Sequence, residues 1–195
     1  MKHSFLATAV LAAAFSAQAA PELIDFDAFG AGTLITNQYS AQGVIFAGAS
    51  ISDYTCCGTP TPALVNATSG GSDLSGRTAS LTMTFASAVS ALSLDYDNYG
   101  GATGAEMLAY DSSSTLLETV ALNPTGIDGF GLSSYGFTAS GISSVQIRTV
   151  GFPSAGWLFA VDNLRFDAAA VPEPTSVALV SLALLGLGLS RRRAA

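Results

Sequence analysis

The chain has 195 residues, and its formal net charge at pH 7 is −7. Residues 21–171 hold three basic residues against thirteen acidic ones, a net charge of −10, so nucleic acid and anionic lipid surfaces are poor partners. The same stretch contains no Lys and no His, which excludes Ser-His-Asp catalysis, Schiff-base lysines and His-ligated zinc.

The N-terminal residues predict a secretory signal peptide over 1–19. Lys2 and His3 are followed by the apolar run Phe5–Phe15 and by the small-residue site Ala17-Gln18-Ala19. We expect cleavage after Ala19, with Ala20 as the alternative. A permanent membrane helix is disfavoured because the apolar run is too short.

Residues 20–167 predict one all-β domain, because apolar residues alternate with polar ones at the period of a strand. In one example Leu81, Met83 and Phe85 alternate with Thr82 and Thr84. No stretch predicts an amphipathic helix. Turn residues separate about nine strands, which indicate an antiparallel β-sandwich of the jelly-roll type. The candidate strands are 23–29, 43–47, 81–85, 92–97, 105–110, 116–122, 134–139, 145–149 and 157–166.

The segment 50–76 predicts a long surface loop with at most short strands. It contains Cys56 and Cys57, the two cysteines of the chain. In an oxidising compartment we expect them to form a vicinal disulfide, which makes a rigid loop tip. Bridges to other molecules and free thiols are the alternatives.

The two ends of the domain suggest a metal site. The domain opens on Ile24-Asp25-Phe26-Asp27 and closes with Asp162-Asn163 inside its last strand. This pattern resembles exported jelly-roll modules, including carbohydrate-binding ones, in which the terminal strands lie side by side. Asp25 and Asp27 are expected on one face of their strand, where Asp162 and Asn163 approach them and supply oxygen ligands for Ca²⁺. The alternative is that these residues are solvated edge positions or turn caps.

Two further groups are candidates for ligand binding. Asp95 and Asp97 precede a glycine turn and suit Ca²⁺ or sugar hydroxyls, with a plain polar strand end as the alternative. Tyr54 and Tyr99 fall on predicted loops and suit stacking against a sugar ring. Trp157 begins an apolar strand, so a core position is expected for it.

The last residues predict a short membrane anchor with unusual flanks. Residues 168–174 form a linker that ends in Pro172-Glu173-Pro174, the apolar run 175–190 follows, and Arg191, Arg192 and Arg193 come next. A helix of that length reaches about 24 Å, less than a bilayer core of about 30 Å. The arginines place the tail 191–195 in the cytoplasm and residues before Pro172 on the far side. A permanent C-terminal anchor and a buried core helix are the alternatives.

These residues resemble the PEP-CTERM sorting signal of Gram-negative bacteria, which exosortase membrane proteases recognise. The resemblance implies export, a transient inner-membrane anchor, cleavage near Pro172-Glu173-Pro174, and release to the medium or attachment at the cell surface. It also implies organisms that secrete exopolysaccharide. Tails of this kind also carry an ice-binding protein C-terminal label, which describes the tail and not an activity of the domain.

Together these features predict an exported surface or biofilm-matrix protein that is not an enzyme and that associates with exopolysaccharide. A carboxylate-dependent glycosidase or lyase is the alternative, but thirteen acidic residues make some carboxylate pair inevitable, so their number does not support it. Ice binding is a third alternative. Regular Thr ladders are missing beyond Thr82-Met83-Thr84.

Overall fold

The computed structural model describes residues 21–53, 62–68, 76–98, 104–122, 132–150 and 158–167. The predicted signal peptide, cysteine pair, sorting segment and membrane helix lie outside these ranges. Within the ranges, no helix has the length and apolar character needed to cross a bilayer.

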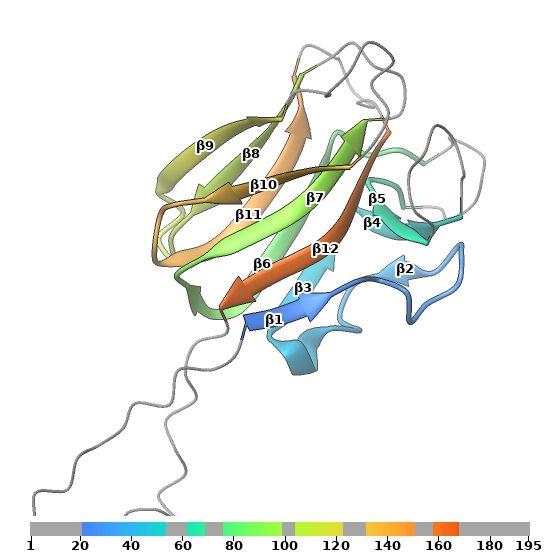
Figure 1. Cartoon of the computed structure of the whole chain (residues 1–195), viewed down its shortest axis with the longest axis horizontal. Coiled ribbons are helices and arrows are strands. Elements are labelled where there is room, and N and C mark those ends of the chain that lie inside the picture. The colour runs from blue at the N-terminus through green and yellow to red at the C-terminus, as the bar shows by residue number, and fades with distance from the viewer. Residues whose placement is uncertain are drawn as a thin grey trace, which may run out of the picture. The chain divides into compact units, whose positions relative to one another are not determined.

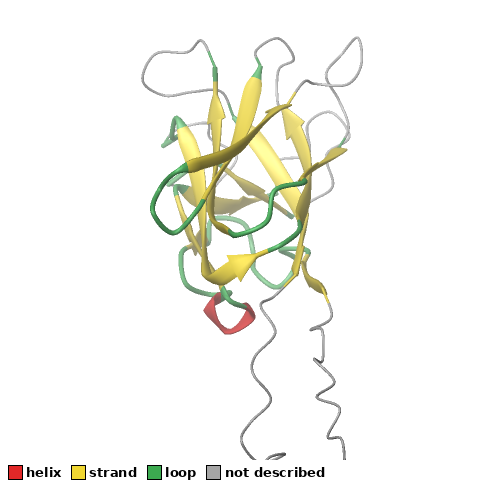
Figure 2. Cartoon of the chain, turned by 90° about the vertical axis from the view of Figure 1, so that its left-hand side faces the viewer, coloured by secondary structure: helices red, strands yellow, loops and turns green. Residues whose placement is uncertain are grey.

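The described chain forms two antiparallel sheets (Figures 1 and 2). The seven-stranded sheet consists of β1 (Pro21–Ile24), β2 (Leu34–Ile35), β4 (Ala49–Ser52), β5 (Ala63–Val65), β7 (Leu92–Asn98), β10 (Ser133–Phe137) and β12 (Phe159–Asp167). The five-stranded sheet consists of β3 (Val44–Ala47), β6 (Ser80–Val89), β8 (Ala105–Tyr110), β9 (Leu116–Leu122) and β11 (Ile142–Thr149). A 3₁₀ turn, η1 (Ser40–Gln42), precedes β3.

The predicted all-β antiparallel architecture is confirmed. Strands run in the order β10-β7-β12-β5-β4-β2 in one sheet, where β1 also pairs with β12, and in the order β3-β6-β11-β8-β9 in the other, so the chain crosses repeatedly between the two sheets. The predicted pairing of the terminal strands is also present. β1 runs antiparallel to β12, with Pro21 opposite Asp167 and Ile24 opposite Leu164.

Alternation of side chains builds the core between the two sheets. On β6, Leu81 and Met83 are fully buried, whereas Thr82 and Thr84 on the other face are not. The same core takes Leu94 and Tyr96 from β7 in the facing sheet. Burial of each large apolar side chain is worth about 1.5–3 kcal/mol, so this interlayer core is the main source of stability.

The segment 50–76, predicted as a surface loop with at most short strands, does contain short strands in its described parts, but these strands are buried and do not lie at the surface. It contains the end of β4 and all of β5, and Ile51 and Leu64 are fully buried. The outward side of these strands is buried as well, since Ser50 and Ser52 have exposed fractions of only 0% and 2%. Small residues buried on both faces give no period-two contrast, and the sequence pattern therefore missed these strands.

β1 is also shorter than the predicted strand 23–29. It ends at Ile24, and Phe26 has a φ of 59°, in the left-handed region that ends regular pairing. The amide of Asp27 donates to Asp25 Oδ1 at 3.2 Å, which closes a turn of the Asx type. Asp25 and Asp27 therefore belong to a turn and not to one face of a strand.

Candidate functional site

The residues expected at the metal site meet where β12 changes its neighbour. The first half of β12 pairs with β5, with Val161 opposite Leu64, and its second half pairs with β1, from Leu164 onward. Asp162 and Asn163 lie between the two pairings, where the register against β7 also shifts. Asn163 adopts a φ of 48°, so the strand bulges at this point.

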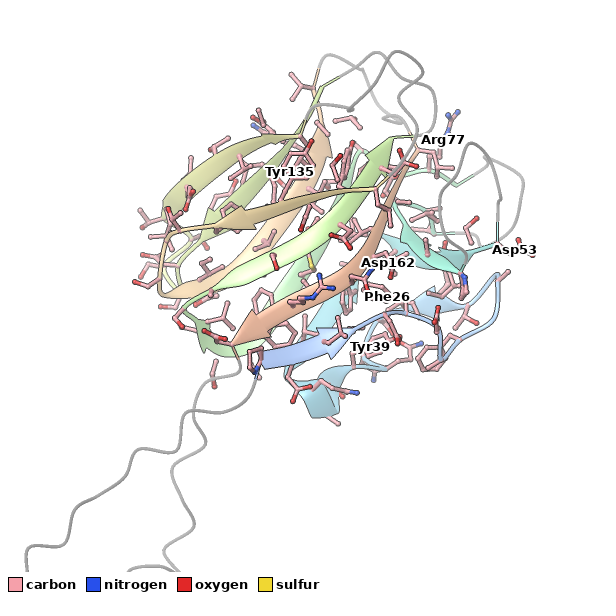
Figure 3. The ribbon with its side chains drawn as sticks, viewed as in Figure 1. Phe26, Tyr39, Asp53, Arg77, Tyr135 and Asp162 are labelled. Atoms are coloured by element: carbon pink, nitrogen blue, oxygen red, sulfur yellow. The ribbon has the colours of Figure 1, made fainter. Side chains whose placement is uncertain are left out.

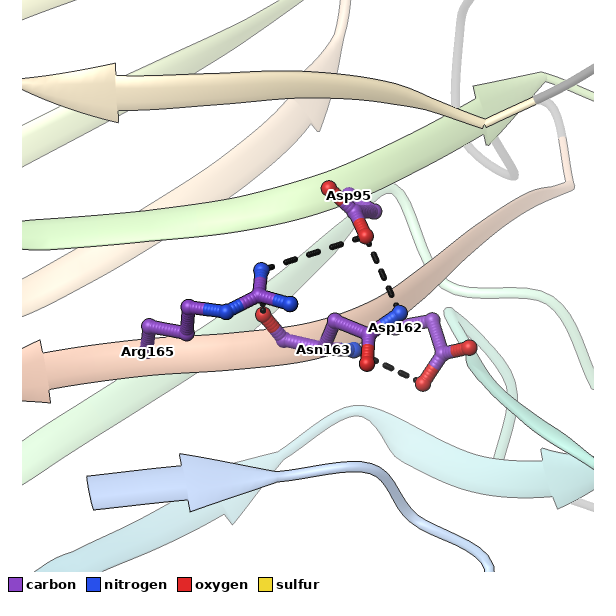
Figure 4. A network of polar contacts seen from close by, with 4 residues as sticks. All are labelled: Asp95, Asp162, Asn163 and Arg165. Atoms are coloured by element: carbon purple, nitrogen blue, oxygen red, sulfur yellow. Dashed lines mark hydrogen bonds and ion pairs between the residues drawn. The ribbon is translucent and has the colours of Figure 1, made fainter.

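A polar network stabilises this bulge (Figure 4). Asp95 on β7 accepts a hydrogen bond from Asn163 Nδ2 at 3.0 Å and lies 4.0 Å from Arg165 Nη1. Arg165 donates to the carbonyl of Asn163 at 3.2 Å, and the Asn163 amide donates to Asp162 Oδ1 at 2.7 Å. These contacts, two of which go to the backbone of Asn163, hold β12 in its unusual conformation.

Acidic groups from two other segments, the turn after β1 and strand β7, lie near Asp162. Asp162 is only 7% exposed. Burial raises the pKa of its carboxyl group to about 6, and the negative charges of Asp27, Asp95 and Asp25 act in the same direction. Tyr39 lies near the same turn, beside β1 (Figure 3). Burial, with the charges of Asp25 and Asp27, raises the pKa of Tyr39 to about 12.

The structure thus brings Asp25, Asp27, Asp162 and Asn163 to one region, as predicted from the pairing of the chain ends. Across the described ranges, however, no group of three or more His, Cys, Asp or Glu side chains is arranged to hold a metal ion. Coordination of Ca²⁺ at these residues stays a prediction.

Of the four predicted ligand residues, two lie within the described part of the chain and two lie outside it. Asp95 and Asp97 lie on the outward side of β7, but Asp97 is only 3% exposed and Asp95 is engaged in the network. Tyr54 and Tyr99 lie outside the described residues. So do Cys56 and Cys57, and the sorting residues Pro172, Glu173, Pro174, Arg191, Arg192 and Arg193.

A further candidate ligand site, which was not predicted, lies on the outward face of the five-stranded sheet. A depression of about 240 Å³ is lined by Thr82, Tyr110, Ser114, Ser144 and Gln146, and we call it the Tyr110 depression. Its side chains are uncharged and consist of hydroxyls, one amide and one partly exposed phenol ring.

Neighbouring contacts fix the shape of this depression. Tyr110 ends β8 opposite Ser144 on β11, and Gln146 lies opposite Thr82 on β6. The next residue, Asp111, accepts hydrogen bonds from the amides of Ser113 and Thr115, each at 2.8 Å, and so orders the turn that follows Tyr110. The depression therefore has a sheet as its floor and an ordered turn at its rim.

The sequence pattern contained a signal for one member of this site, although it was not proposed as a ligand residue. The alternation of Val145 and Ile147 with Gln146 and Arg148 indicated that Gln146 lies on the outward face. What the sequence did not contain was the cross-strand register, which alone places Tyr110 beside Ser144.

A larger depression, of about 400 Å³, lies on the seven-stranded sheet. Its lining includes Ser93, Gly136, Arg165 and Asp167. A Cβ at Gly136 would come within 2.9 Å of the Leu92 carbonyl oxygen, so the absent side chain keeps the strands close here. Described aromatic residues in the lining are Phe137 and Phe166, which are buried, so no exposed ring in it is available for stacking.

Comparison with known proteins identifies the tail. Residues 170–193 match the family model for the PEP-CTERM protein-sorting motif, which confirms the sorting signal predicted around Pro172-Glu173-Pro174. The motif indicates export and membrane-anchored sorting. No curated protein sequence matches the chain.

Solved structures similar to the chain include variants of a carbohydrate-binding module of family 29. One has a TM-score of 0.45 at 15% identity, over 80% of this chain and 98% of that one. A second, complexed with cellulohexaose, has a TM-score of 0.44 at 15% identity, over 77% and 92%. A third, complexed with mannohexaose, has a TM-score of 0.43 at 15% identity, over 75% and 90%. Likeness at these values does not carry a ligand over to this chain.

Proposed function

We propose that the chain is an exported cell-surface or matrix protein whose β-sandwich is a non-enzymatic module that binds extracellular polysaccharide at the Tyr110 depression. The sorting tail holds the precursor in the inner membrane, an exosortase cleaves it near Pro172-Glu173-Pro174, and the sandwich then reaches the surface or the medium. The matched sorting motif supports the route. The chemistry of the depression supports the binding.

The observation behind the binding proposal is a partly exposed tyrosine ring set among uncharged hydrogen-bonding groups. An aromatic face attracts the C–H surface of a sugar ring, while amide and hydroxyl groups exchange hydrogen bonds with sugar hydroxyls. Gln146 offers both a donor and an acceptor, and Thr82 and Ser144 offer hydroxyls. Because strands hold most of these groups, little ordering is needed on binding.

The glycosidase alternative finds weaker support. Asp95 and Asp162 lie opposite each other in register, and the raised pKa of Asp162 is suited to a general acid. A glycosidase needs its two carboxylates on either side of a sugar bond in an open cleft. Asp162 is buried, and neither residue lines the Tyr110 depression or the larger depression on the other sheet. The pair is therefore better placed to shape β12 than to reach a substrate.

Binding can be tested with mature protein and the exopolysaccharide of the producing cells. Tyr110→Ala should weaken retention in affinity electrophoresis about fivefold or more, since one stacked aromatic ring contributes on the order of 1 kcal/mol or more. Tyr110→Phe keeps the ring and should bind nearly as wild type. Urea unfolding of both variants checks the fold. The binding proposal fails if wild-type protein is not retained, or if Tyr110→Ala binds unchanged.

The sorting route has its own test, the intact mass of the protein recovered from the cell surface and the medium. The mass should correspond to a chain that has lost residues 1–19 and the tail beyond the sorting signal. Deletion of the exosortase should leave the tail on a membrane-bound precursor. Mature protein that retains residues 175–195 in wild-type cells would contradict cleavage.

A further inference from the structure

Cross-strand pairing aligns five residues across the five-stranded sheet, with a register shift between Ala109 and Tyr110 where β8 meets β9. Cross-strand pairing puts Ile45 of β3 opposite Thr84 of β6, Thr84 opposite Ser144 of β11, Ser144 opposite Tyr110 of β8, and Tyr110 opposite Leu116 of β9. Adjacent strands lie about 4.8 Å apart, so this line extends roughly 19 Å. We call it the cross-strand line.

The two ends of this line expose apolar side chains. Ile45 is 45% exposed and Leu116 is 49% exposed, which is unusual for large apolar residues on a sheet face. A second depression, of about 190 Å³, includes Ile45 and Thr84 in its lining and lies beside the Tyr110 depression, across β6. The contact surface therefore continues beyond Tyr110 toward β3.

The charge of the domain restricts the class of polysaccharide that can bind at these depressions. The side chains that line the two depressions are uncharged, and those of Glu106 and Arg148, farther along β8 and β11, form an ion pair with each other. Residues 21–171 carry a net charge of −10, so the field of the domain repels a polyanion. No group in the depressions can compensate that repulsion with a positive charge.

We infer that the cross-strand line is a groove for an extended stretch of a neutral polysaccharide, bound along its length with Tyr110 as the central stacking residue. This inference rests on the proposed function and specifies the ligand class and the way it lies. A polymer of several sugar rings covers the line from β3 to β9, and its apolar ring faces contact Ile45 and Leu116. A single terminal sugar occupies only the centre.

A series of oligosaccharides of increasing length tests this inference. Fragments released from the cells' neutral exopolysaccharide, fractionated by size, are titrated into mature protein by calorimetry. Affinity should rise with length until a fragment spans the line and then level off. Ile45→Ser and Leu116→Ser should each weaken long fragments roughly threefold and leave the shortest fragment unchanged. Leu23→Ser, on β1 of the other sheet and 54% exposed in wild type, is the matched control and should change nothing.

The outcomes separate this inference from the proposed function. If Tyr110→Ala loses binding but affinity does not depend on length, or Ile45→Ser behaves as Leu23→Ser, the groove is wrong while polysaccharide binding stands. If uronate-rich polymer binds as tightly as neutral polymer at low salt, the ligand class is wrong. If Tyr110→Ala binds every fragment as wild type, the proposed site fails as well.

Discussion

The outward faces of the two sheets use polar residues in opposite ways. On the seven-stranded sheet, Asp95, Asp162, Asn163 and Arg165 bond mainly to one another and hold a bulge in β12. On the five-stranded sheet, uncharged groups around Tyr110 line an open depression. Charged groups that satisfy each other stabilise a conformation, whereas uncharged groups facing an open depression are available to a ligand.

This difference is useful because the charged face is the more conspicuous one in the sequence. Carboxylates attract functional hypotheses, yet here they are buried or paired. We call the outward side of the seven-stranded sheet around Asp95, Asp162, Asn163 and Arg165 the acidic face. Variants of the acidic face should change stability and leave polysaccharide binding intact. Variants of the Tyr110 depression should weaken polysaccharide binding and leave stability intact.

The largest stability effect on the acidic face is expected from Asp162→Asn. The folded-state pKa of Asp162 is raised to about 6 from 3.8, so folding favours the protonated form. The stabilising contribution of this carboxyl group is therefore fully present below pH 3.8. It is lost as pH rises through 6, which lowers the free energy of unfolding by up to about 3 kcal/mol. The Asn variant lacks this loss, and its free energy of unfolding near neutral pH should exceed that of wild type.

Urea unfolding at about pH 4.5 and about pH 7.5 measures this difference between the two proteins. Asp53→Asn removes one negative charge from an exposed position and serves as the control. Its pH dependence should match that of wild type. If the free energy of unfolding changes by the same amount between the two pH values in wild type, Asp162→Asn and Asp53→Asn, the assignment to Asp162 is wrong.

The sequence predicted most of the sheet structure, because period-two alternation is strong wherever one face of a strand is buried and the other is wet. All nine predicted strands have counterparts, from β1 to β12. It did not locate β2, β4 and β5, which are two to four residues long, although it allowed short strands within 50–76. β4 and β5 are also buried on both faces, and such strands leave no contrast to read.

The candidate site was predictable only in its parts. That the chain ends pair was correct, and it brought Asp25 and Asp27 toward Asp162. Their placement on a strand was wrong, because a left-handed Phe26 turns the chain after Ile24. Tyr110 was missed because its neighbours come from β6 and β11, and only the register of those strands brings them together.

A smaller effect on the acidic face is expected from Asn163, and a pair of variants isolates its two roles. In Asn163→Gly the new residue also tolerates a φ of 48°, but the hydrogen bond to Asp95 is lost. This variant should lower the free energy of unfolding by about 1 kcal/mol or less. Asn163→Ala removes the same hydrogen bond and also the short polar side chain that lets Asn adopt the left-handed region, while it keeps the Cβ, so it should lower the free energy of unfolding by about 1–2 kcal/mol. Urea unfolding measures both. Polysaccharide affinity should stay at the wild-type value in both variants, because the Tyr110 depression lies on the other sheet. A loss of affinity in Asn163→Ala, with the fold intact, would mean that the acidic face takes part in binding.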